Sequence, residues 1–192
     1  MQIIAVTTLA VLAGVAAQAG ETYQSAERRV TVCMEMGGAF KVAAQAQSIA
    51  SRMFSGIGVT VDWRHRCPAD GLLISFSACT PADQLPRALA YALPYEGTHI
   101  VILYDRVLQA PPTLRPRLLA HVLVHEITYI LQALAWHSNE GAMKAHWDAS
   151  DVSAMRRQLL PFAPEDIGLI YRGLALRAAR DAARETATPT TQ

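Results

Sequence analysis

Apolar residues recur along the chain at two different intervals, and each interval predicts one type of secondary structure. Every second residue from 30 to 36 is apolar, which is the period of a strand with one buried face. From 39 to 54 the apolar residues recur every three or four positions, as on the buried face of an amphipathic helix. Residues 59–63 follow two glycines and have the composition of a second strand. The first third of the chain therefore predicts strand, helix, strand.

The middle of the chain contains three more predicted strands and a long helix. Residues 71–76 are a near-continuous apolar run, so we expect a strand that is buried on both faces. The stretch 89–94 is short and suits an edge strand, while 98–105 has the apolar content of a buried strand. Three prolines precede an apolar helix that begins near Arg117. A last helix is expected from Pro164, where an acidic first turn suits the positive end of the helix dipole.

These elements predict one domain of the α/β (α+β) class. We expect a twisted mixed sheet of four to five strands with an edge strand, a central helix and a C-terminal helix. The 192 residues are enough for a single domain with its own core, which we place at 20–184. The polar segment 185–192 is expected to be disordered. The net charge of +1 gives no basic excess that would attract nucleic acid or anionic lipid.

The first nineteen residues are an apolar run that ends in Ala17-Gln18-Ala19, the small-x-small pattern of a secretory signal peptide. Cleavage before Gly20 would leave a mature chain with no stable membrane association, in a secreted or periplasmic location. No Lys or Arg precedes the apolar run, so an uncleaved membrane anchor is the alternative.

The chain has three cysteines, Cys33, Cys67 and Cys79. An odd count in an exported chain leaves at least one thiol free. Cys67 and Cys79 flank the strand predicted at 71–76 and are candidates for a disulfide. The spacing of the cysteines has no CxxC character, so we expect no metal at them, and buried single thiols are the alternative.

The candidate chemistry lies on the long helix and in the segment after it. His125 and Glu126 are adjacent, and position 129 is one turn later on the face of His125. Zinc hydrolases take two ligands from such positions, because residues four apart on a helix rise only about 6 Å and project the same way. The neighbouring carboxylate can then take a proton from the activated water. The third ligand must come from chain that turns back toward the helix, as His137 would.

This region resembles the metzincin clan of zinc endopeptidases, and within it the matrixins. The resemblance is carried by His125-Glu126-Ile127-Thr128-Tyr129, then His137-Ser138, then Gly141-Ala142-Met143. It implies a zincin-like fold in which His125 and His137 bind Zn²⁺, Glu126 is the general base and Met143 lies in a turn beneath the metal. It also implies that the edge strand at 89–94 pairs with extended peptide substrate.

The sequence departs from the family's pattern around Tyr129. Tyr129 stands where the family has its second histidine ligand, and no glycine ends the helix after it. The gap from His125 to His137 is longer than the common metzincin spacing, so we expect a longer helix or a looser turn before Trp136. A phenol has a pKa of about 10, and Tyr129 must lose its proton to become a strong ligand.

His121 and His146 are candidate substitute ligands. His121 lies one turn before His125, so the two imidazoles could hold a metal together. The alternative is a structural histidine whose ring proton goes to a carbonyl or carboxylate. Structural alternatives hold equally for the other residues: His125 with Glu126 could be a core pair, and Met143 could simply fill the core.

Three functional hypotheses follow. The first is a secreted zinc-dependent metalloendopeptidase that hydrolyses peptide bonds in a peptide or protein substrate, with activity weakened by Tyr129. The second is an inactive metzincin-like pseudoenzyme that binds peptides along its edge strand, with zinc bound weakly or not at all. The third is an α/β domain in which the motif is coincidental. The sequence gives no substrate preference and no oligomeric state.

Overall fold

The computed structural model describes residues 28–35, 40–92 and 98–187. The predicted signal peptide at 1–19 and the last residues, 188–192, lie outside these ranges. Within the described ranges, no helix has the length and apolar character that crossing a membrane requires.

Five strands form one sheet in the order β2-β1-β3-β5-β4. The strands are β1 (Arg29–Glu35), β2 (Thr60–Arg64), β3 (Leu72–Ser77), β4 (Ala90–Ala92) and β5 (His99–Leu103). Four of them run parallel, and β4 pairs antiparallel with β5 at one edge. The predicted mixed sheet with a short edge strand is therefore confirmed.

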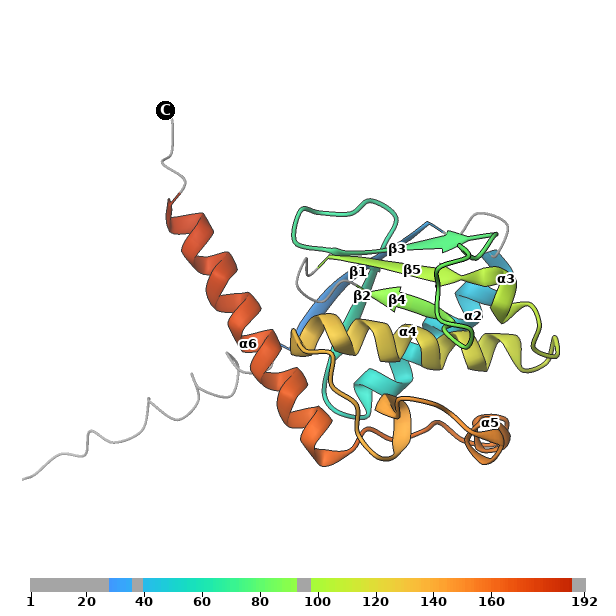
Figure 1. Cartoon of the computed structure of the whole chain (residues 1–192). Coiled ribbons are helices and arrows are strands. Elements are labelled where there is room, and N and C mark those ends of the chain that lie inside the picture. Colours follow the sequence, from blue (N-terminus) through green and yellow to red (C-terminus); the bar gives the residue numbers. More distant parts are fainter. Residues whose placement is uncertain (1–27, 36–39, 93–97, 188–192) are drawn as a thin grey trace, which may run out of the picture.

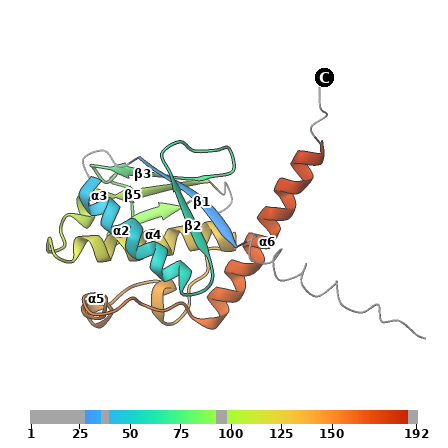
Figure 2. The ribbon, with the colours of Figure 1, turned by 180° about the vertical axis from the view of Figure 1, so that it is seen from behind.

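Helices cover one face of this sheet (Figure 1). The two helices of this layer, α2 (Phe40–Ser55) and α4 (Arg115–Gln132), pack against each other. The other helical elements of the described ranges are α3 (Tyr104–Val107), a 3-10 turn η2 (Gly141–Met143), α5 (Ala149–Met155) and α6 (Pro164–Ala187). Both views show α6 meeting the body near the end of α4 and then projecting away from it (Figure 2).

The sheet has one buried face rather than two. Leu72 and Ile74 of β3 are fully buried against the helices, while Leu73 and Ser75 on the other face are half-buried. The prediction that residues 71–76 are buried on both faces is wrong. In the described part of the chain, the connections from β2 to β3 and from β3 to β4 contain no helix, and the helices lie on the other face of the sheet (Figure 1).

Several helices and strands begin or end at other residues than the apolar periodicity predicted. The strand predicted at 98–105 ends at Leu103, because Tyr104 begins α3. Helix α5 was not predicted from sequence, and Asp148 starts it with a capping box. Helix α6 continues to Ala187, beyond the point where a disordered tail was expected.

Cys33 of β1 and Cys67 form a disulfide, and Cys79 is free and exposed. The candidate bridge between Cys67 and Cys79 is therefore wrong. The two residues lie before and after β3, at opposite ends of that strand, so their side chains cannot meet.

Candidate functional site

Helix α4 positions three of the predicted site residues. The helix is buried almost throughout its middle, which fixes the rotation that presents His125, Glu126 and Tyr129. It continues past Tyr129 to Gln132 and ends with Ala133 in a left-handed conformation, φ 53°. Ala133 therefore makes the turn that ends α4, and the chain leads from there to His137.

One ring nitrogen of His125 is held by the backbone. Its Nδ1 lies 3.0 Å from the carbonyl oxygen of Ala142, and because a carbonyl only accepts, Nδ1 carries the proton. Nε2 then has the free lone pair that a metal or a proton donor could use. The Trp147 ring packs edge-on against the imidazole at a centroid distance of 5.5 Å, which further fixes its orientation.

The rings of His125, Tyr129 and His137 meet at one place. The centroid distances are 4.6 Å from His125 to Tyr129, 5.6 Å from His125 to His137 and 5.4 Å from Tyr129 to His137. The Tyr129 hydroxyl forms a hydrogen bond with Nε2 of His137. The structure thus brings together the three side chains that the sequence proposed as a ligand set.

Glu126 is buried and lies close enough to Tyr129 for its charge to affect that phenol. Only 7% of the residue is exposed, and its Oε2 has no hydrogen-bond partner in the described part of the chain. Burial raises the pKa of its carboxyl to about 8. Burial also raises the pKa of the Tyr129 phenol, and the nearby Glu126 charge adds to that shift. The carboxyl is therefore able to exchange protons near neutral pH.

Both imidazoles are neutral at neutral pH. Burial lowers the pKa of His125 to about 4, with a smaller contribution from the charge of His137. Burial and the neighbouring His146 likewise lower the pKa of His137. Neutral imidazole is the form that binds a metal ion.

The 3-10 turn η2 packs against α4 next to His125. Met143 in this turn is fully buried, and its carbonyl accepts a hydrogen bond of 3.1 Å from the amide of Ser138. Gly141 has a φ of +75°, and a Cβ there would lie 2.2 Å from the carbonyl oxygen of Pro161. The turn therefore requires glycine, and it holds the segment after His137 against α4.

The two candidate substitute ligands have different surroundings. Both ring nitrogens of buried His121 face backbone groups: Nδ1 lies 2.7 Å from the Arg117 carbonyl oxygen, and Nε2 accepts from the Leu160 amide at 3.1 Å. His121 therefore links α4 to the chain before α6, as in the structural alternative. His146 is exposed and close enough to His137 to affect its pKa.

A metal at this site would depend on the phenol. Among the described residues, no group of three or more His, Cys, Asp or Glu side chains is arranged to hold a metal ion. The Nε2 lone pair of His125 is free to bind zinc. Nε2 of His137 is hydrogen-bonded to the Tyr129 hydroxyl, which must first give up its proton and this bond. The three side chains could therefore bind zinc, but the need to deprotonate Tyr129 would lower the affinity.

Sequence reasoning did not assign a role to Trp147. Its ring lies 5.5 Å from His125 and 6.2 Å from His121, and its Nε1 donates to the Gly141 carbonyl at 3.3 Å. The signal in the sequence is only a tryptophan shortly after the predicted turn. Its contact with the helix depends on a fold of the chain that periodicity does not describe.

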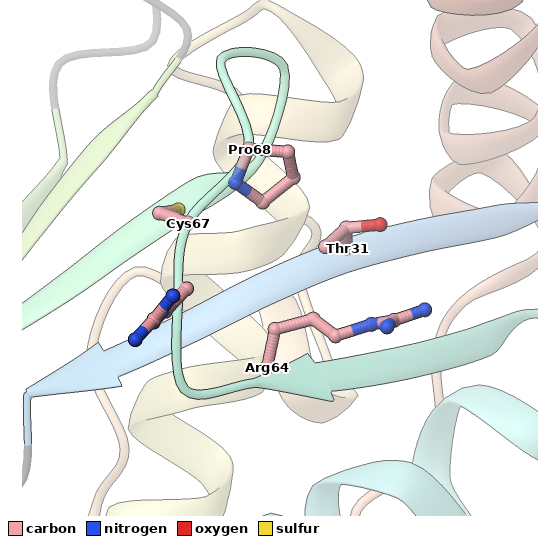
Figure 3. A pocket seen from close by; sticks show the side chains of 5 residues that line it. Thr31, Arg64, Cys67 and Pro68 are labelled. Atoms are coloured by element: carbon pink, nitrogen blue, oxygen red, sulfur yellow. The ribbon is translucent and has the colours of Figure 1, made fainter.

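A separate surface hollow lies away from these residues (Figure 3). Its lining includes Thr31 of β1, Arg64 at the end of β2, and Cys67 with Pro68 of the following loop. Arg64 is largely exposed and is paired with Asp62 at 2.7 Å. None of the predicted site residues lines this hollow.

No protein-family model matches the chain, and no curated protein matches it.

Proposed function

We propose that this chain is a zinc-dependent metallopeptidase of metzincin-like type that hydrolyses peptide bonds in peptide or protein substrates. The observation that carries the proposal is the meeting of His125, Tyr129 and His137 beside the buried carboxyl of Glu126. The order of the strands and the antiparallel edge strand are compatible with the zincin-like fold that the motif implies.

The residues that would hold Zn²⁺ are His125 and His137 through Nε2, and Tyr129 through its oxygen. When bound, zinc lowers the pKa of water from about 16 to about 7 and polarises a carbonyl group. Tyr129 would have to lose its proton first, and burial raises the pKa of this phenol. The proposed site therefore binds zinc more weakly than one with three histidines.

Glu126 is the proposed general base. Its carboxylate takes the proton of the attacking water and gives it to the leaving amine of the substrate. A pKa of about 8 suits both transfers near neutral pH, since efficient proton transfer needs a group that titrates close to the working pH. The edge strand β4 would hold the substrate in an extended conformation by pairing with its backbone.

One contact favours a second candidate, a pseudoenzyme that binds peptides without cleaving them. The Tyr129 hydroxyl occupies Nε2 of His137, the nitrogen that a metal would need. Zinc must therefore compete with this hydrogen bond. The two candidates share the fold and the peptide-binding edge, and they differ in whether metal binds tightly enough to support cleavage.

The test measures zinc content and casein cleavage for the wild type, Glu126→Ala and Tyr129→His. The peptidase proposal expects zinc near one equivalent in the wild type and cleavage that is lost in Glu126→Ala. Metal and cleavage that occur only in Tyr129→His would reject it in favour of the pseudoenzyme. Absence of zinc from all three proteins would reject the metal site itself.

We also propose export through the apolar segment 1–19. The mature protein would then begin at Gly20. Expression of the full chain followed by mass measurement of the exported protein tests this, and retention of an uncleaved chain in the membrane fraction would support the anchor instead.

A further inference from the structure

The Trp147 ring packs against two histidines of α4 at once. His121 and His125 are one turn apart on this helix, and their ring centroids lie 6.2 and 5.5 Å from that of Trp147. Both pairs are edge-to-face, with interplanar angles of 81° and 78°. Such contacts are directional, because the positive edge of one ring meets the negative face of the other. A change in the orientation of either imidazole would therefore disturb its contact with Trp147.

His121 is the fixed member of this group of rings. It is fully buried, and both of its ring nitrogens are bonded to backbone groups, those of Arg117 and Leu160. Its ring cannot turn without breaking these two hydrogen bonds. Trp147 therefore packs against an imidazole whose orientation is set independently of the candidate site.

Two consecutive carbonyl groups of η2 hold the other two rings. The Gly141 carbonyl accepts a hydrogen bond of 3.3 Å from Nε1 of Trp147, and the Ala142 carbonyl lies 3.0 Å from Nδ1 of His125. The indole and the imidazole therefore share one short turn as their support. A half-turn of the His125 ring would place a carbon atom at the Ala142 carbonyl and remove this bond.

The backbone next to Trp147 is fixed by a small group of charges. Lys144 Nζ lies 2.9 Å from Asp148 Oδ2 and 2.5 Å from Asp151 Oδ2. The Asp148 amide donates to Asp151 at 2.9 Å, as part of the capping box that starts α5. These bonds link the residues on both sides of Trp147, so the segment that carries the indole has a defined conformation.

Apolar packing alone does not account for the contacts of Trp147. The side chain is half-buried and also packs against the apolar core, as a leucine or a methionine could. Neither of those side chains could form an edge-to-face contact or donate a hydrogen bond to the Gly141 carbonyl. The tryptophan therefore adds directional contacts that an aliphatic residue would lack.

We infer that Trp147 is a positioning residue for the candidate metal site: backed by the fixed ring of His121, its indole holds the His125 ring in the orientation that leaves Nε2 available for a metal. This inference rests on the proposed function, because the orientation of Nε2 has a chemical consequence when a metal binds there. Loss of a group that orients a ligand typically lowers metal affinity about 10 to 100 fold.

The first experiment determines the tautomer of His125 by proton–nitrogen NMR of the zinc-free protein at neutral pH, with signals assigned from His125→Gln. The variants are Trp147→Leu, which keeps apolar bulk, Trp147→Phe, which keeps an aromatic ring, and Trp63→Phe as a control. Trp63 lies on β2 and donates to Ser51 of α2 at 2.8 Å, so its loss should lower stability without reaching His125.

We expect a single tautomer with the proton on Nδ1 in wild type, Trp147→Phe and Trp63→Phe, and a mixture of both tautomers in Trp147→Leu. A general loss of stability would not produce such a mixture, as the control shows. If Trp147→Leu does not fold, Trp147→Met takes its place. Wild-type protein adds a check without any variant, since nuclear Overhauser contacts should join the Trp147 indole to the rings of His121 and His125, and their absence would reject the inference.

The second experiment measures zinc affinity by competition with a chromophoric chelator in the same proteins. We expect affinity to fall about tenfold or more in Trp147→Leu and to stay within about threefold of wild type in Trp147→Phe and Trp63→Phe. The near-normal affinity of Trp147→Phe would show that the ring contact, rather than the bond to Gly141, positions His125.

The outcomes separate the two proposals. Wild-type protein that binds zinc, with the tautomer and the affinity of Trp147→Leu equal to those of Trp63→Phe, would overturn the positioning role and leave the proposed function intact. Wild-type protein that binds no zinc would overturn the proposed function. The tautomer measurement alone then decides the positioning role, and a single Nδ1-protonated form in Trp147→Leu would reject it.

Discussion

Tyr129 determines the chemistry of the candidate site at the scale of single residues. Its hydroxyl can act in two opposite ways: as an anionic ligand after losing its proton, or as a hydrogen-bond donor that keeps Nε2 of His137 occupied. Burial and the charge of Glu126 raise the pKa of the phenol, which favours the protonated form until a cation binds. Removing the hydroxyl while keeping the ring distinguishes the two roles.

We expect Tyr129→Phe to lower zinc affinity at least tenfold, because it removes the third donor of the proposed site. Titration calorimetry with zinc chloride at pH 7.5 measures this, with Tyr104→Phe as a control on a different helix. A gain in affinity in Tyr129→Phe would show that the hydroxyl only blocks His137, and would contradict its role as a ligand.

Glu126 should make the zinc-free protein less stable as the pH rises. Its carboxyl has a folded pKa of about 8 against an ordinary value of 4.5, so the folded state binds the proton more tightly than the unfolded state. The resulting stabilisation is fully present below about pH 4.5 and is lost toward pH 8, by at most about 1.4 kcal/mol per pH unit. Glu126→Gln does not titrate and should not show this loss.

Urea unfolding of both proteins from pH 5.5 to 8, with zinc removed, measures this effect. The stability advantage of Glu126→Gln over wild type should grow across the range. His125 titrates in both proteins, so its contribution largely cancels in the difference. A difference that does not change with pH would show that Glu126 is ionised in the folded protein throughout.

At the scale of elements, local periodicity predicted the long helices and missed the short ones. Strand β1 and helices α2 and α4 have enough residues for their period to be recognised. Helices α3 and α5 have 4 and 7 residues, too few turns to show an apolar face. For the same reason His125, Glu126 and Tyr129 could be placed on one helix from spacing alone.

The end of α4 has a conformation that suits glycine better than the residue present. Ala133 has a φ of 53°, where a Cβ costs roughly 1 kcal/mol. We expect Ala133→Gly to raise the free energy of unfolding by up to about 1 kcal/mol. Ala182→Gly in exposed α6 is the matched control and should lower it by roughly 0.5 to 1 kcal/mol. Chemical denaturation measures both, and a loss of stability in Ala133→Gly would argue against a left-handed cap.

At the scale of the whole molecule, contacts between distant segments decided what the sequence could not. His121 remained a candidate ligand in the sequence because its partner, the Leu160 amide, lies 39 residues away. The partner of Cys67 depends on where its loop lies against β1, which no spacing predicts. Strand β3 is buried on one face only, because the connections from β2 to β3 and from β3 to β4 contain no helix that could cover the other face. Each of these is a property of the assembled fold.

The packing of α6 on α4 is the contact on which the integrity of the site most depends. Gly173 has no room for a side chain, since a Cβ would lie 1.5 Å from the Leu131 carbonyl oxygen. Gly173→Ala must therefore move α6 away from the end of α4, at a cost of about 1 to 3 kcal/mol. Because His137 lies on the segment that leaves the end of α4, the same displacement should weaken zinc binding at the proposed site.

Gly168→Ala is the matched control on the same helix. A Cβ at Gly168 meets nothing within 4 Å, and alanine is the better helix former, so this variant should be as stable as wild type or slightly more stable. Melting temperature and zinc affinity are measured for both variants. If Gly173→Ala melts like Gly168→Ala, α6 is not packed against α4 as described. If it loses stability but binds zinc like wild type, the position of His137 does not depend on α6.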